Sequence, residues 1–80
     1  EVLEHLLYPA RALKEIFTLV KPGGHCLLTV PNGRNDFYPG HINFWSPESW
    51  RVFVEENVGG AGHVSATLIN GLNAALIHFK

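Results

Sequence analysis

The chain has 80 residues, a formal net charge of −1 and a hydrophobic content of 46%, which is typical of a folded globular protein rather than of a disordered segment. Its 6 basic and 7 acidic residues form no run of one sign, so no electrostatic footprint for a nucleic-acid backbone or an anionic membrane is evident. The apolar runs are too short to span a membrane, and no signal peptide opens the chain.

The single cysteine, Cys26, lies inside an apolar run and cannot form a disulfide within the chain. This favours a reducing compartment, and we expect a cytoplasmic protein in which Cys26 is a small core residue. His25 and Cys26 are no nucleophile pair, because adjacent strand residues point to opposite faces.

The first regular element is an amphipathic helix predicted over residues 9–20. Pro9 suits the first helical position, and the apolar residues Leu13, Ile16, Phe17 and Val20 recur at helical spacing. The segment 21–24, Lys-Pro-Gly-Gly, ends this helix and is a turn rather than a phosphate-binding loop, since it leads from a helix into a strand.

A buried strand is predicted over residues 25–30, whose almost continuous apolar run is typical of a strand covered on both faces in a parallel sheet. The sequence Pro31-Asn32-Gly33 ends the strand, and residues 32–44 form a loop. In open α/β sheets, ligands bind at this end of the strands.

A second helix is predicted over residues 47–57, with Ser46 as its N-cap and Trp50 among its apolar positions. A flexible glycine-rich exit follows at 59–62. Strands are then predicted over 64–69 and 72–79, joined by Asn70-Gly71 in an antiparallel hairpin. We expect both tryptophans, Trp45 and Trp50, to be core or helix-packing residues.

Two segments, Glu1-Val2-Leu3-Glu4-His5 and residues 19–32 (LVKPGGHCLLTVPN), resemble the second half of class I S-adenosylmethionine-dependent methyltransferases, including the type 11, type 23 and ubiquinone-pathway O-methyltransferase groups. The resemblance implies an α/β fold: the C-terminal portion of a Rossmann-like sheet, in the order helix, strand, helix, hairpin. It also implies that residues 1–80 are a partial domain of a longer protein. The cofactor-binding N-terminal half of the family lies upstream of Glu1, so we expect no cofactor-binding residue in this segment and no activity from it alone.

The resemblance implies methyl transfer from S-adenosylmethionine to an acceptor, with a small molecule as the first choice and a lipid precursor, a sugar or RNA as the others. The long loop carries Asn32, Phe37 and Tyr38 as candidate substrate residues. The alternative is an ordinary connection that packs its aromatic side chains locally.

Glu1, Glu4, His5 and His41 form a candidate ligand set for a divalent metal ion, because carboxylates and imidazoles suit magnesium, manganese, iron or zinc. The set resembles two metal-assisted branches of the superfamily, the ubiquinone-pathway O-methyltransferases and the small-RNA 2′-O-methyltransferases. In the alternative, the acids cap a short helix and the histidine bonds a neighbouring loop.

A non-catalytic methyltransferase-like module is a further hypothesis, in which strand 25–30 offers an unpaired edge to the missing N-terminal half or to another chain. The remaining histidines, His25, His63 and His78, have no partner at ligand spacing in the sequence. We therefore expect them to be surface or structural residues.

Overall fold

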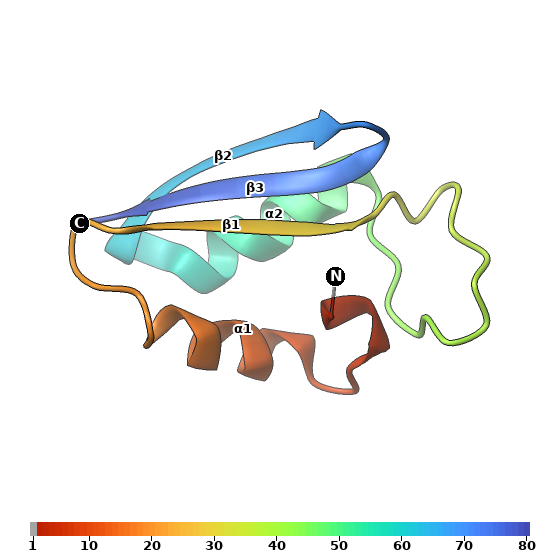
Figure 1. Cartoon of the computed structure of the whole chain (residues 1–80), viewed down its shortest axis with the longest axis horizontal. Helices are drawn as coiled ribbons and strands as arrows, with labels where there is room; N and C mark the ends of the chain where they lie inside the picture. The colour runs from red at the N-terminus through yellow and green to blue at the C-terminus, as the bar shows by residue number, and fades with distance from the viewer. Residues whose placement is uncertain (1) are drawn as a thin grey trace.

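The computed structural model describes residues 2–80, and Glu1 lies outside the described part. The helical elements are η1 (Leu3–His5), α1 (Pro9–Phe17), α2 (Pro47–Val58) and η2 (Gly59–Ala61), and the strands are β1 (His25–Pro31), β2 (Gly62–Ile69) and β3 (Leu72–Phe79). Figure 1 shows α1 and α2 on the same side of the three strands, with a long loop between β1 and α2.

Helix α1 begins at Pro9 as predicted but ends at Phe17, three residues before the predicted end. The amides of Thr18, Leu19 and Val20 bond the carbonyls three residues earlier, which are those of Glu15, Ile16 and Phe17. This tighter pattern is common in the last turn of a helix that runs into Pro and Gly. The prediction was wrong for residues 18–20 because apolar spacing alone does not distinguish the two kinds of turn.

The sheet has the strand order β1-β3-β2, and both pairings are antiparallel. Asn70 and Gly71 join β2 to β3 with positive φ angles of 50° and 79°, the conformation of a tight hairpin turn. The predicted hairpin is therefore confirmed. β2 starts two residues earlier than predicted, and the glycine-rich exit forms the short helix η2 instead of a flexible segment.

The two faces of this sheet differ sharply in burial. Val30, Ile77 and Phe79 point toward the helices and are buried, whereas Leu27 on the opposite face is 62% exposed. The expectation that strand 25–30 is covered on both faces is thus wrong within residues 2–80. A continuous apolar run predicts a buried strand, but it does not report whether the covering elements belong to the same segment.

Aromatic residues fill the core between α2 and the sheet. Trp45 and Trp50 are 9% and 1% exposed, and their ring centroids lie 5.4 Å apart in an edge-to-face arrangement. Phe53 joins them from the next turn of α2, with its ring centroid 4.9 Å from that of Trp45. The core role predicted for both tryptophans is confirmed.

The loop after β1 returns to the sheet through close backbone contacts. The Gly33 amide donates to the Trp45 carbonyl at 2.7 Å, and a Cβ at Gly33 would lie 2.8 Å from the Trp45 nitrogen. The buried side chain of Asn73 on β3 donates to the same carbonyl at 2.9 Å. Only glycine permits this approach, which fixes both ends of the loop against the sheet.

Among the described residues, no helix has the length and apolar character needed to cross a membrane.

Candidate metal centre

The loop after β1 is bonded to η1, so that residues almost forty positions apart lie side by side. The Glu4 carbonyl accepts hydrogen bonds from the amides of Ile42 and Asn43 at 2.8 and 3.0 Å. The Asn43 side chain donates to the carbonyls of Leu3, at 2.9 Å, and of Leu6. Asn43 therefore binds carbonyl groups at both ends of η1 and ties the loop to this short helix.

This contact brings together Glu4, His5 and His41, three of the four predicted metal ligands. One ligand atom from each lies within 4.8 Å of the others. The ring centroids of His5 and His41 are 4.5 Å apart and nearly perpendicular. The fourth predicted ligand, Glu1, lies outside the described residues.

The Glu4 side chain is 1% exposed, and neither carboxylate oxygen has a hydrogen-bond partner within residues 2–80. The Nε2 atom of His5 lies 3.7 Å from Glu4 Oε1, beyond hydrogen-bond distance. A helix cap would place a carboxylate oxygen on a backbone amide, and no such bond is present in this part of the chain. A buried carboxylate without partners is costly, whereas a bound cation would compensate it, so the residues fit a metal ion.

Both histidines use the same ring nitrogen in a hydrogen bond to the loop. His5 Nδ1 donates to the Gly40 carbonyl at 2.9 Å, and His41 Nδ1 donates to Asp36 Oδ2 at 2.6 Å. A proton on Nδ1 leaves Nε2 with a free lone pair, which is the form that binds metals. Hydrogen bonds of this kind orient histidine ligands in known metal sites.

The carboxyl group of Asp36 is held ionised beside His41. Partial desolvation raises its pKa, but hydrogen bonds from the His41 side chain and the Tyr38 amide, together with the charges of His41 and His5, outweigh this and lower the pKa below its usual value. A lowered pKa means that the contribution of Asp36 is complete above the ordinary carboxyl range, near about 3.9, and is lost as pH falls through the folded-state value.

Asp36→Asn is therefore expected to weaken divalent-ion binding about 10- to 100-fold, because an uncharged acceptor orients His41 less firmly. Calorimetric titration with Mn²⁺ at pH 7 measures this. Asn35→Ala, at the neighbouring exposed position, is the matched control and should leave the affinity unchanged. Equal affinities for Asp36→Asn and the wild type would show that Asp36 does not support the site.

The candidate substrate residues lie on the same loop. Phe37 is 87% and Tyr38 63% exposed, and the Tyr38 ring centroid lies 4.9 Å from that of His41. The Asn32 side chain instead bonds within the loop, where its oxygen accepts from the Arg34 amide at 3.1 Å. The structure thus brings Tyr38 next to the metal ligands and gives Asn32 a bond that shapes the turn.

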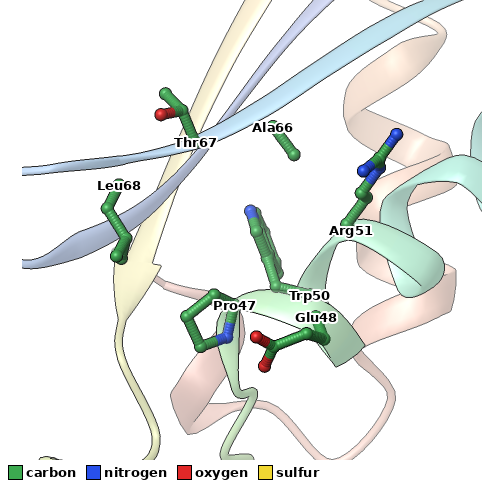
Figure 2. Close-up of a pocket in the computed structure, with 7 residues that line it drawn as sticks. All are labelled: Pro47, Glu48, Trp50, Arg51, Ala66, Thr67 and Leu68. Carbon is green, nitrogen blue, oxygen red and sulfur yellow. The ribbon is translucent and has the colours of Figure 1, made fainter.

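A surface hollow of about 280 Å³ lies elsewhere, between the first turns of α2 and strand β2. Figure 2 shows its lining: Pro47, Glu48, Trp50, Arg51, Ala66, Thr67 and Leu68. None of these residues belongs to η1 or to the segment that carries His41, so the hollow is separate from the candidate metal centre.

Sequence reasoning missed Asp36 and Asn43 as parts of the site. Their roles depend on contacts with His41 and with η1, and no spacing rule predicts such contacts. The sheet register also sets His25, His63 and His78 in one row of exposed side chains, which agrees with the expectation that they are surface residues.

The fold as a whole is similar to that of a chain in a solved structure, "Structure of the Pnkp1/Rnl/Hen1 RNA repair complex". The TM-score is 0.72 with 23% sequence identity, over 98% of the present chain and 20% of that chain. The present chain thus spans about a fifth of that chain's length. At this identity the likeness shows the fold alone, which is consistent with a partial Rossmann-like fold.

The sequence itself identifies the family. The model of the family described as "Methyltransferase domain" matches residues 1–59, and the chain belongs to this family of class I methyltransferases. The predicted family and fold class are confirmed. A search of the curated proteins finds no significant match.

Proposed function

We propose that this chain is the acceptor-side part of an S-adenosylmethionine-dependent O-methyltransferase in which Glu4, His5 and His41 hold a divalent metal ion. The observation that carries the proposal is the buried Glu4 carboxylate, which has no partner within residues 2–80 and faces two histidines whose Nδ1 atoms are engaged elsewhere. An ion bound there would polarise an acceptor hydroxyl and lower its pKa.

The chain's own residues would position the acceptor. The loop presents the exposed aromatic rings of Phe37 and Tyr38, and the Tyr38 ring lies beside that of His41, which suits stacking of a planar or apolar acceptor. Burial of Glu4 and His41 limits access of bulk water to the ligands, which strengthens their electrostatic effect. Alignment of acceptor and methyl donor, rather than covalent catalysis, is then the main task of the site.

We place a small molecule with neighbouring oxygens first as the acceptor. Arg34, the basic residue of the loop, is paired with Glu48 at 2.7 Å, and no cluster of basic side chains accompanies it in residues 32–44. The ribose at an RNA end carries similar neighbouring hydroxyls, and the solved structure of similar fold is titled as an RNA repair complex. RNA is therefore the second acceptor to assay.

Cofactor binding would depend on residues outside this segment. Within residues 2–80, strand β1 pairs with β3 alone, so its other edge is free to accept a further strand. We propose that the remainder of a longer protein, or another chain, pairs there and supplies the S-adenosylmethionine site. Burial raises the pKa of the Cys26 thiol, which disfavours the reactive thiolate. We propose a reducing, cytoplasmic setting because this cysteine is free.

The test is methyl transfer by the full-length protein from labelled S-adenosylmethionine to a catechol, with and without Mg²⁺ or Mn²⁺. We expect transfer that EDTA abolishes, and that His41→Ala reduces about 100-fold or more, within the range that a positioned charge-stabilising group contributes. His63→Ala, in β2 and away from this site, is the control.

A short RNA oligonucleotide serves as a second acceptor in the same assay, and preference for it would replace the small molecule. Transfer that neither EDTA nor His41→Ala affects would contradict the metal-assisted proposal. Absence of transfer to any acceptor, with no affinity for the cofactor, would instead favour a non-catalytic interaction module.

A further inference from the structure

We propose that His25, His78 and His63 form a second metal site, selective for borderline transition ions such as Cu²⁺, Ni²⁺ or Zn²⁺, on the uncovered face of the sheet. The three residues lie on three adjacent strands. The register pairs His25 of β1 with His78 of β3, and His63 of β2 with the same His78. Directly paired residues point to the same face, so the three imidazoles form one row with His78 at its centre.

Two of the rings are already arranged side by side. The centroids of His25 and His78 lie 4.3 Å apart, and their planes differ by only 12°. Imidazole nitrogens bind Zn²⁺ at about 2.0–2.1 Å, so two nitrogens on one ion lie within roughly 4 Å of each other. Rotation of the two side chains out of this stacked arrangement would turn one nitrogen of each ring toward a common ion.

His63 can complete the set by side-chain rotation. It is exposed, as are His25 and His78, and no helix of the described chain covers this face (Figure 1). The hydrogen bonds made by histidine rings within residues 2–80 belong to His5 and His41, so the ring nitrogens of the row are not occupied by such bonds. Its cross-strand position places His63 about 4.5–5.5 Å from His78 at Cβ, within reach of a shared ion.

The donor set determines the class of ion. All three ligands are neutral imidazoles, and the residues two positions along each strand on this face, Leu27, Leu76 and Ser65, offer no carboxylate. Imidazole suits Cu²⁺, Ni²⁺ and Zn²⁺, whereas Mg²⁺ and Ca²⁺ require oxygen ligands. The row should therefore bind in the order Cu²⁺ above Ni²⁺ or Zn²⁺, with no response to Mg²⁺.

This site is separate from the candidate metal centre. His25 begins β1, and the loop that carries His41 leaves the opposite end of this strand, which has seven residues and is about 20 Å long. The proposal also does not depend on the proposed methyl transfer. The metal affinity of each site can be measured separately when the other site is removed by substitution of a ligand.

The experiment is a titration of the full-length protein with Ni²⁺ and, separately, Cu²⁺, in a His41→Ala background that removes the other site. We expect His78→Gln to weaken binding by more than about tenfold, since loss of an outer-shell partner alone costs that much. Ser65→Ala, on the same face and paired with Leu76, is the matched control and should bind as the background does.

A second measurement distinguishes loss of a metal ligand from loss of the folded structure. Electron paramagnetic resonance of the Cu²⁺-loaded background protein should show coupling to at least two nitrogens, and His78→Gln should lose it while its far-ultraviolet circular dichroism stays unchanged. Equal affinity in the His25→Gln, His63→Gln, His78→Gln triple variant and the background would overturn the proposal. So would a Cu²⁺ spectrum without nitrogen coupling.

Discussion

Replacing Glu4 by methionine is expected to stabilise the metal-free protein while abolishing its stabilisation by divalent ions. The Glu4 carboxylate is almost fully buried and both of its oxygens lack partners within residues 2–80. Methionine has a similar shape and no polar atoms to leave unpaired, so Glu4→Met should gain about 1–3 kcal/mol in the absence of metal. Urea denaturation with EDTA measures the free energy of unfolding directly.

Added metal should change the free energies of unfolding in the opposite direction, by stabilising the wild type relative to Glu4→Met. A ligand that binds only the folded state stabilises it, by about 2.7 kcal/mol at a concentration one hundred times its dissociation constant. We expect Mn²⁺ to stabilise the wild type and to leave Glu4→Met unchanged, so the order of the two proteins reverses at saturating ion. Glu48→Met, at an exposed acid, is the control. A loss of metal-free stability in Glu4→Met would show that the carboxylate has a structural partner instead.

Trp50→Ala is expected to cost the most stability of any single truncation in the chain. The Trp50 side chain is 1% exposed, and its ring packs against Trp45 and Phe53 between α2 and the sheet. Truncating a buried tryptophan costs about 3–5 kcal/mol. For a domain of this length the whole free energy of unfolding is on the order of 4–12 kcal/mol, so a large share is lost.

The measurement is thermal unfolding followed by circular dichroism, with Phe44→Ala as the control because Phe44 is a 51% exposed aromatic residue. Trp50→Phe should recover most of the loss. The indole Nε1 has no hydrogen-bond partner within the described chain, so removing that group leaves no broken bond behind. A cost for Trp50→Ala no larger than that for Phe44→Ala would mean that the aromatic cluster does not hold α2 on the sheet.

The predictions for Glu4 and Trp50 are linked, because core packing positions the segments that carry the candidate metal ligands. The aromatic cluster fixes α2, and with it the end of the loop at Trp45, while Gly33 and Asn73 fix the same segment to β1 and β3. The intervening loop then contacts η1 through Asn43. The approach of His41 to Glu4 therefore depends on core packing as well as on the ligands, so core substitutions should also reduce metal affinity.

The sequence by itself determined the local elements, because these depend on neighbours along the chain. Pro9 and Ser46-Pro47 mark the helix starts, and Asn70-Gly71 favours positive φ angles and predicts the hairpin turn. The acid and histidine spacing at residues 4 and 5 also indicated the candidate ligands. Such signals act over a few residues and need no knowledge of the sheet.

Only the tertiary structure decided which distant residues meet. Placing β3 between β1 and β2 aligns three histidines that the sequence separates by as many as 53 positions. No helix within residues 2–80 covers the face on which they lie. The contact of the loop with η1 likewise sets Asp36 and His41 beside Glu4 and His5. These relations arise from strand order and long-range hydrogen bonds, whose energies depend on the whole packed arrangement and leave no periodic pattern in the sequence.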